Sequence, residues 1–248
     1  MGSGNVASVL VRNFAKRSIK VTNIIARNSR RGQLLADECG AVWSEDWNDS
    51  VPEDDIVISA VKDSAAAGLW SKCDFGDRLV LHTAGTLDME VLKPFARNYG
   101  VLYPLQTISA SRDMDFSGVP LLIEGSSADN LSRIRELAAL VSENVREVDS
   151  GTRKKLHLAA VFANNFSNLC FRIAWEMLEQ QQLEPELLLP LIDETCAKLH
   201  AAAPSKAQTG PAVRWDENVM KKHLEMLTEE KELSEIYQIM SREIHRRS

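Results

Sequence analysis

The feature that most restricts the fold of this chain is a regular alternation of short apolar stretches with amphipathic ones in its first 150 residues. The apolar stretches are rich in Val, Ile and Leu and are bounded by polar or turn residues, which is typical of β-strands. They cover residues 19–26, 55–61, 78–84, 100–105 and 119–124. Between them, residues 5–16 and 29–39 show helical spacing, the second segment stops at Gly40, and Asp63 is expected to cap a third helix. This order predicts right-handed crossovers and a mainly parallel sheet with helices on both faces, an α/β fold of the Rossmann type.

In the rest of the chain the strand pattern disappears. Apolar residues at helical spacing run through residues 152–182. Further helical patterns cover residues 185–201, 216–227 and 229–247. Pro190 is expected to kink or restart the first of these, and residues 203–211 are expected to form a loop. We therefore predict two domains, a nucleotide-binding domain over residues 1–150 and an all-helical domain over residues 151–248.

Residues 2–7 form a glycine motif that is typical of dinucleotide-binding loops. It reads G-x-G-x-x-A and consists of Gly2, Ser3, Gly4, Asn5, Val6 and Ala7. In such a motif the first glycine permits a tight turn and the second lets the backbone approach a pyrophosphate. The helix that follows directs its free N–H groups and the positive end of its dipole at the phosphates. A flexible glycine-containing tail is the alternative, but a helix and then a strand follow at the proper distance, which favours the binding loop.

The motif departs from the Rossmann pattern in one respect, because almost no strand precedes it. That strand is normally central, so its omission would leave a gap in the sheet. A mis-assigned start, leading residues outside this numbering, or a neighbouring strand that closes the gap would each account for the departure. The sequence does not decide among them.

The strand predicted over residues 19–26 is followed by a basic segment that consists of Arg27, Asn28, Ser29, Arg30 and Arg31. A site for NAD has a carboxylate at this point to bind the ribose 2′-hydroxyl, and this segment has none. Arginines and a serine suit a 2′-phosphate, since guanidinium groups pair with phosphate oxygens. A solvated basic helix start is the alternative, but positive charge opposes the dipole at a helix N-terminus, and a bound anion would remove that conflict. The segment therefore predicts NADPH rather than NADH.

The next two strands also end in residues that are expected to contact the cofactor. Val61 and Lys62 lie where the strand of residues 55–61 ends, and Thr83 lies at the end of the strand of residues 78–84. Ligands of open α/β sheets lie beyond the carboxyl ends of the strands, so these residues should lie near the ribose and the nicotinamide. A surface lysine is an equally good interpretation of Lys62.

The fourth strand, over residues 100–105, leads to a first group of candidate catalytic residues. Gln106 and Thr107 follow it and offer amide and hydroxyl groups toward the crevice. A structural turn explains these two residues nearly as well, and Tyr103 beside them is expected to pack inside.

A second group of candidates lies on the long helical pattern of residues 152–182. His157, Asn164 and Asn168 are spaced so that an α-helix places them on one face, and Asn165 lies next to them. Buried amides need partners, which a ligand carbonyl or the nicotinamide carboxamide would supply. Hydrogen bonds between helices are the alternative for each residue taken singly. We select His157, Asn165 and Gln106 as candidate catalytic residues.

The order of several motifs resembles a known family. They are GSGNVAS, HTAGTL, YPLQTIS, RKKLHLAAVFANNFSN, LLPLIDET and AQTGPAVRWD. Together they resemble a Rossmann-like family of uncharacterised NADP oxidoreductases with a domain of unknown function. That family is related to pyrroline-5-carboxylate reductase and to coenzyme F420-dependent NADP oxidoreductase. The resemblance covers essentially the whole chain and implies NADP(H) as the cofactor and a homodimer formed through the C-terminal helices.

The resemblance also implies one missing group. Related β-hydroxyacid dehydrogenases have a catalytic Lys four residues before the second Asn of a pair, and Val161 stands at that position here. Their standard proton donor is therefore absent. His157 is the candidate substitute as a general acid, because histidine titrates near neutral pH.

Composition excludes several other classes of function. The net charge of −6 argues against nucleic acid as a general partner, and no apolar run is long enough to cross a membrane. The four cysteines are far apart and the five histidines are scattered, which indicates reduced thiols in a cytoplasmic protein and no metal site.

These observations favour an NADPH-dependent oxidoreductase that reduces a small carbonyl or imine compound at the domain interface. A non-enzymatic NADP-binding sensor or interaction protein is the alternative, which the missing Lys favours. A third interpretation is a reductase that uses a deazaflavin as its hydride partner. It is implied only by the relation to the coenzyme F420-dependent family.

Overall fold

The computed structural model describes residues 1–47 and 56–248, except for the side chain of Ser29. Its contacts divide the chain into two compact units, Met1–Leu169 and Cys170–Ser248. The first unit therefore holds all of the strands and also the first part of the long helical segment. The predicted division of function near residue 150 stays a prediction.

The first unit contains two sheets, which are largely parallel. A two-stranded sheet pairs β1 (Asn23–Ile25) with β2 (Val42–Ser44). A five-stranded sheet has the order β3 (Ile56–Ser59), β4 (Leu79–His82), β5 (Asn98–Pro104), β6 (Leu121–Gly125) and β7 (Val145–Glu147). Among the strand pairs of residues 1–47 and 56–248, only β5–β6 is antiparallel. The predicted mainly parallel α/β fold is confirmed, and each predicted strand is present with shorter or shifted bounds; residue 55 lies outside the described residues.

Short helices of the first unit connect these strands. They are α1 (Asn5–Lys16), α2 (Ser29–Cys39), α3 (Asp63–Trp70), a 3₁₀ turn (Met89–Leu92), α4 (Ala128–Ala139) and α5 (Ser150–Ala160). Helix α2 ends at Gly40 in the left-handed conformation, as predicted. The prediction that Asp63 caps α3 was wrong, because Lys62 occupies the cap position and the Asp63 carboxylate accepts a hydrogen bond from Thr86 at 2.6 Å.

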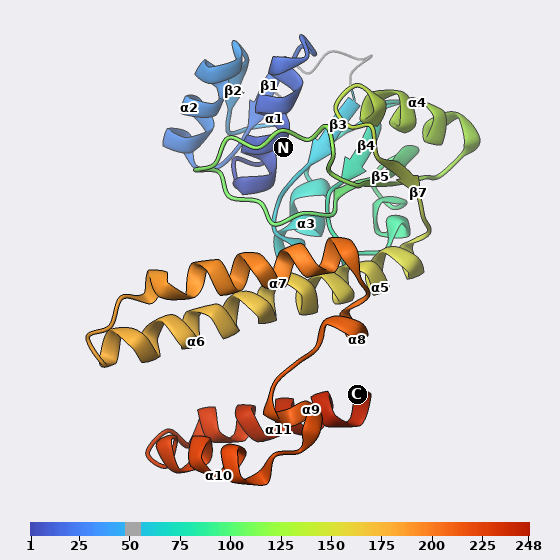
Figure 1. Cartoon of the computed structure of the whole chain (residues 1–248). Coiled ribbons are helices and arrows are strands. Elements are labelled where there is room, and N and C mark those ends of the chain that lie inside the picture. The colour runs from blue at the N-terminus through green and yellow to red at the C-terminus, as the bar shows by residue number, and fades with distance from the viewer. Residues whose placement is uncertain (48–55) are drawn as a thin grey trace. The chain divides into compact units, whose positions relative to one another are not determined.

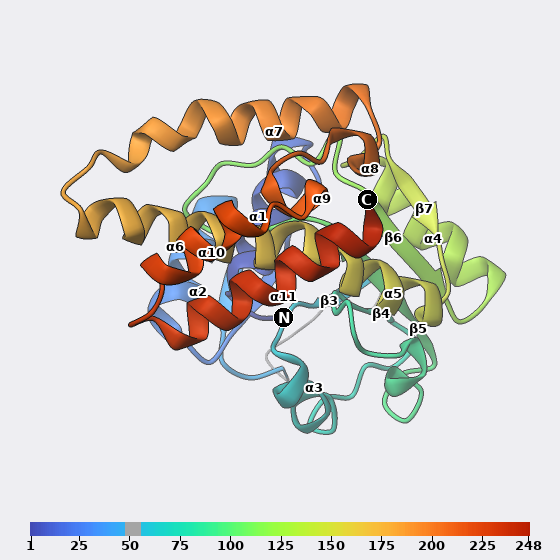
Figure 2. The same ribbon diagram turned by 60° about the horizontal axis from the view of Figure 1, so that its bottom comes forward.

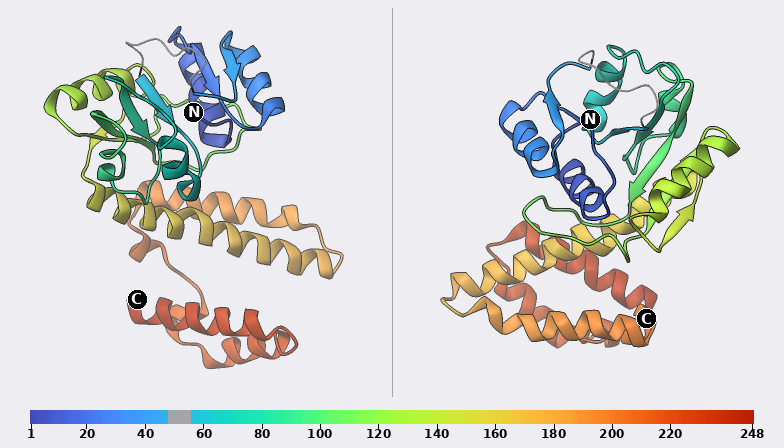
Figure 3. Two further views of the ribbon diagram at one scale, coloured as in Figure 1. Left: turned by 180° about the vertical axis from the view of Figure 1, so that it is seen from behind. Right: turned by 90° about the horizontal axis from the view of Figure 1, so that it is seen from above.

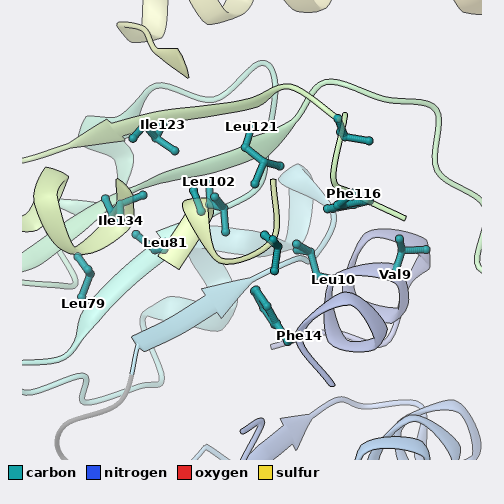
Figure 4. Close-up of a cluster of buried hydrophobic side chains, with 13 residues drawn as sticks. Val9, Leu10, Phe14, Leu79, Leu81, Leu102, Phe116, Leu121, Ile123 and Ile134 are labelled. Atoms are coloured by element: carbon teal, nitrogen blue, oxygen red, sulfur yellow. The ribbon is translucent and has the colours of Figure 1, made fainter. Parts of the chain in front are cut away.

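The core lies on both faces of the five-stranded sheet. Leu79 and Leu81 of β4 point to one face, where they pack with α1 and α4, and Val80 between them points to the other. Figure 4 shows the first cluster, which joins Leu10 and Phe14 of α1 to the sheet. Burying a side chain of this size stabilises the fold by about 1.5–3 kcal/mol, so these contacts hold α1 against the sheet.

The two sheets lie on either side of the glycine motif. Strands β1 and β3 belong to separate sheets, and Figure 3 shows the β1–β2 pair apart from the larger sheet. The N–H of Gly2 donates to the carbonyl of Ile25 at 2.8 Å, and the N–H of Ala60 donates to the carbonyl of Met1 at 2.9 Å, so the first two residues link the two sides.

A single helical run leaves the sheets after β7. It consists of α5, a π-helical turn (Val161–Phe166) and α6 (Ser167–Gln180), and Figure 2 shows it as one rod. It confirms the helix predicted over residues 152–182, but the π-helical turn was not predicted.

The second unit, in which every residue is described, is helical throughout. After α6 come a 3₁₀ turn (Pro185–Leu188), α7 (Leu189–Ala201), α8 (Pro204–Ala207), α9 (Pro211–Arg214), α10 (Glu217–Met226) and α11 (Lys231–Arg247). Pro190 lies in the first turn of α7, so it restarts the helix as predicted. The loop predicted over residues 203–211 was partly wrong, because Pro204 begins the short helix α8 there.

Candidate cofactor and active site

The glycine motif forms an open turn at the start of α1. Gly2 has φ of 100°, and a Cβ on it would lie 2.5 Å from the carbonyl oxygen of Ala60, so a side chain cannot replace its hydrogen. Gly4 caps α1, and a Cβ on it would meet nothing within 4 Å. No side chain caps the helix and no acidic residue lies in its first turn. The free N–H groups and open space suit a pyrophosphate.

The basic segment after β1 presents cations without anionic partners. Arg27, Arg30 and Arg31 are exposed, and within the described part of the chain none of their side chains forms an ion pair. Asn28 caps α2, because its Oδ1 accepts a hydrogen bond from the N–H of Arg31 at 3.0 Å. The side chain of Ser29 lies outside the described residues. Free guanidinium groups at a helix N-terminus fit a phosphate.

The residues predicted after β3 and β4 lie at the carboxyl ends of these strands. Val61 is half-buried and Lys62 is exposed at the start of α3. Thr83 is buried, and its N–H donates to the carbonyl of Ser59 at 3.3 Å, which extends the pairing of the two strands.

His82, one residue earlier, is a buried neutral group. Its Nδ1 accepts a hydrogen bond from the N–H of Ala84 at 3.2 Å. Burial, together with the nearby charge of Arg153, lowers the pKa of His82 to about 4. It is therefore uncharged at neutral pH and does not act as an acid there.

His157 on α5 meets Tyr103 near the end of β5. The Tyr103 hydroxyl lies 2.9 Å from Nδ1 of His157, and the two rings meet edge to face. Gly85, after β4, makes room for this pair, because a Cβ there would lie 2.5 Å from the same Nδ1. Burial raises the pKa of the Tyr103 phenol. Sequence reasoning placed Tyr103 inside but missed its pairing, since the two residues are 54 positions apart.

Arg153, one helical turn before His157, ties α5 to the sheet. Its side chain is fully buried, pairs with Glu124 at the end of β6, and donates to the carbonyl oxygen of Leu87 at 2.6 Å and to Ser150 Oγ at 3.0 Å. Glu124 also accepts the N–H of Ser150 at 3.0 Å. Sequence reasoning missed this role, because Arg153 stands beside Lys154 and nothing local distinguishes the buried cation from the exposed one.

Gln106 and Asn165 are both exposed side chains. The Oε1 of Gln106 accepts the N–H of Thr107 at 2.9 Å. Asn164 and Asn165 are exposed on the π-helical turn, and Asn168 is exposed on α6. The expected common face assumed α-helical spacing throughout, and the wider turn breaks that register. Within the described residues, no hydrogen bond joins Gln106 or Asn165 to Tyr103 or His157.

Two further features are absent from residues 1–47 and 56–248. There is no group of three His, Cys, Asp or Glu side chains that could hold a metal ion. No helix in that part is both long enough and apolar enough to cross a membrane.

An open glycine turn before a helix and free arginines after the next strand are the features of a dinucleotide-binding fold. Residues 1–85 match the family model described as NADP oxidoreductase, coenzyme F420-dependent. Residues 119–244 match the model described as a domain of unknown function, DUF2520. The chain belongs to the DUF2520 family.

Solved structures agree with this assignment. A Bacteroides fragilis protein, provisionally assigned as an NADP oxidoreductase, is 38% identical with a TM-score of 0.94, over 99% of this chain and 96% of its own. A Thermotoga maritima protein is 20% identical with a TM-score of 0.74, over 99% and 96%. An imine reductase from Myxococcus stipitatus in complex with NADP+ is 16% identical with a TM-score of 0.65, over 97% and 91%.

A comparison with curated proteins found no match. The family and fold predicted from the sequence are nevertheless confirmed, and so is NADP(H) as the cofactor of this kind of fold.

Proposed function

We propose that this chain is an NADPH-dependent reductase of a small carbonyl or imine compound. The observation that carries the proposal is the Tyr103–His157 pair near the end of β5, in the unit that also holds the open glycine turn. In open α/β sheets the carboxyl ends of the strands are where dinucleotides and their substrates bind.

The residues present fit the cofactor at three points. The backbone from Gly2 to Val6 and the N-terminus of α1 would hold the pyrophosphate, with Ser3 and Asn5 at its edge. Arg27 and Arg30 would bind the 2′-phosphate, and Val61, Lys62 and Thr83 would border the ribose and nicotinamide. When bound, NADPH supplies a hydride.

The protein has to supply the proton that the product needs on its oxygen or nitrogen atom. The Tyr103 hydroxyl lies 2.9 Å from Nδ1 of His157, which leaves Nε2 as the ring nitrogen that can meet a substrate. In its imidazolium form His157 would give the Nε2 proton to the product and be left as neutral imidazole, so His157 is the proton donor and Tyr103 positions it. Gln106 and Asn165 stay proposals as amide donors to the substrate.

A homodimer through the C-terminal helices is part of the proposal. Helices α6 and α7 have no buried residue, although both carry large apolar side chains. Leu169, Phe171, Leu189 and Leu191 are among those that are exposed. Apolar helix faces are normally covered, and a second copy of this chain is the expected cover. The four free cysteines support a reducing compartment such as the cytoplasm.

Calorimetry tests the cofactor part of the proposal. The unaltered chain should bind NADPH more tightly than NADH. The double variant Arg27→Ala, Arg30→Ala should weaken NADPH at least about 10-fold and leave NADH nearly unchanged, since each charge-assisted bond contributes about 1.5–3 kcal/mol. Arg146→Ala, an exposed arginine on β7, is the matched control and should have no effect. Equal weakening of both cofactors would contradict the 2′-phosphate role.

Turnover tests the reductase part. NADPH oxidation is followed with a panel of keto acids and cyclic imines, and at least one compound should be reduced. His157→Gln should lower kcat about 100-fold or more with NADPH binding retained. Tight NADPH binding without turnover of any compound in a broad panel would favour the NADP-binding sensor instead.

A further inference from the structure

A long connection between β5 and β6 runs along helix α1. Residues 105–120, all of which the structure describes, contain no helix or strand, although β5 and β6 are antiparallel neighbours that a turn of about two residues could join. Connections longer than about 12–15 residues without secondary structure are uncommon in compact domains and usually have a function. Figure 1 shows this segment, in green, as it runs out beside α1. The joining of two strands therefore does not explain its length.

The later part of this connection is fixed to α1 by a buried amide. Asn13 is fully buried; its Nδ2 donates to the carbonyl oxygen of Met114 at 2.8 Å, and its Oδ1 accepts the N–H of Phe116 at 2.9 Å. The side chain of Phe116 is buried in the cluster that contains Leu10 and Phe14 (Figure 4). Buried hydrogen bonds are costly to break, so residues 114–116 form a fixed anchor.

The earlier part is held by two side chains of α1 that are not buried. Asn5, in the glycine motif, donates from Nδ2 to the carbonyl oxygen of Ile108 at 3.2 Å. Arg12 donates from Nη1 to the carbonyl oxygen of Ala110 at 2.6 Å, and its Nε pairs with Glu38 of α2 at 2.8 Å. Residues 106–116, here called the strap, thus follow α1 from its N-terminus onward.

The strap begins with two of the polar residues that were considered for substrate binding. Gln106 and Thr107 have exposed side chains, and they lie in the chain between Tyr103 of β5 and Ile108. Because Ile108 is bonded to Asn5 of the glycine motif, the strap sets where these amide and hydroxyl groups lie relative to the turn that would hold the cofactor.

We propose that Arg12 is a positioning residue for the proposed reduction: its bond to Ala110 holds the strap so that Gln106 and Thr107 meet a substrate beside the cofactor. The inference rests on the proposed function and adds to it the residue that sets the place of the substrate donors. Arg12 acts through the strap, since its guanidinium is occupied by Ala110 and Glu38.

Two variants separate the bond to the strap from the ion pair. Arg12→Ala removes both, whereas Glu38→Ala removes the ion pair and leaves the bond to Ala110. Both side chains are partly exposed, so both variants should fold.

Steady-state kinetics with a compound that the unaltered chain reduces gives the first readout. Arg12→Ala should raise KM for that compound about 10-fold and leave kcat nearly unchanged, because the displaced strap weakens a substrate hydrogen bond while His157 stays in place. NADPH affinity, measured by calorimetry, should stay within about 2-fold, and Glu38→Ala should change none of these quantities. Arg12→Lys keeps a donor for Ala110 and should restore most of the KM.

Hydrogen exchange tests the strap without turnover. The N–H of Arg112 donates to the carbonyl oxygen of Ser109 at 3.2 Å and closes a turn that contains Ala110. This amide should exchange at least about 10-fold faster in Arg12→Ala and at an unchanged rate in Glu38→Ala. The amide of Phe116, which Asn13 holds, should be unchanged in both variants.

Three outcomes would overturn the inference. Unchanged exchange at Arg112 in Arg12→Ala would show that the bond to Ala110 does not hold the strap. Equal KM in Arg12→Ala and Glu38→Ala would overturn the positioning role alone and leave the proposed function intact. Failure of the unaltered chain to reduce any compound would overturn the proposed function and this inference with it.

Discussion

The first unit contains two regions that are built in different ways. In residues 1–47, the features that would hold a cofactor arise between near neighbours: the glycine turn opens α1, and Asn28 caps the helix that carries the arginines. In residues 56–169, the site arises between distant ones, since Tyr103 and His157 are 54 positions apart and Arg153 and Leu87 are 66 apart. The comparison teaches that the proposed binding region is set largely by local motifs and the proposed catalytic region by long-range contacts. Figure 1 colours the first of these regions blue and the second from light blue to yellow.

The largest effect is expected where the catalytic region is most tightly held. Arg153→Met should lower the free energy of unfolding by about 3–5 kcal/mol, because it leaves the Glu124 carboxylate without its buried partner. Urea denaturation measures this loss. Lys154→Ala, which removes an exposed ion pair with Asp88, is the control and should cost less than about 1 kcal/mol. Similar losses for both variants would contradict the structural role of the buried Arg153–Glu124 pair.

Acid should weaken the same region through His82. Its pKa is about 4 in the folded chain and about 6.5 in the unfolded one, so the unfolded state binds the proton first. The contribution is therefore intact above pH 6.5 and is lost as the pH falls to 4, up to about 3 kcal/mol. Thermal melts across this range should show the loss in the unaltered chain and in His200→Gln, an exposed control, and a smaller loss in His82→Asn. An unchanged pH profile in His82→Asn would contradict this account.

A methyl group at Gly85 should separate binding from chemistry. Gly85→Ala places a carbon atom against Nδ1 of His157, so the ring must shift, and kcat should fall about 100-fold. NADPH affinity, measured by calorimetry, should change little, because the binding region is not touched. Gly118→Ala, where an added Cβ would meet nothing within 4 Å, should leave both quantities unchanged. Parallel losses of affinity and kcat in Gly85→Ala would show that the two regions are not separable.

The smallest effect is expected at Tyr103. Tyr103→Phe keeps the ring contact with His157 and removes one hydrogen bond, so kcat should fall about 2- to 10-fold and the pH profile of kcat should shift. Tyr99→Phe, which removes a hydroxyl bond to Glu90, is the matched control. A fall as large as that of His157→Gln would mean that Tyr103 itself donates the proton.

The same contrast explains how much the sequence could predict. The alternation of strands and helices, the helix end at Gly40 and the restart at Pro190 depend on local patterns, and all were predicted correctly. Strands β2 and β7 were missed because neither three-residue strand contains a run of Val, Ile or Leu, whereas β1 lies within the longer apolar stretch of residues 19–26. The antiparallel direction of β6 has no local signature, and neither has a buried arginine beside an exposed lysine.

The π-helical turn between α5 and α6 changes how the rest of that helix is oriented about its own axis. Each residue of an α-helix advances about 100° around the axis, so one extra residue in a turn rotates all later side chains by roughly that angle. Within the first unit, the direction of Asn168 about the helix axis is therefore offset from that of His157 by comparison with a uniform α-helix. A deletion of one residue within the turn would restore the α-helical spacing of these two side chains.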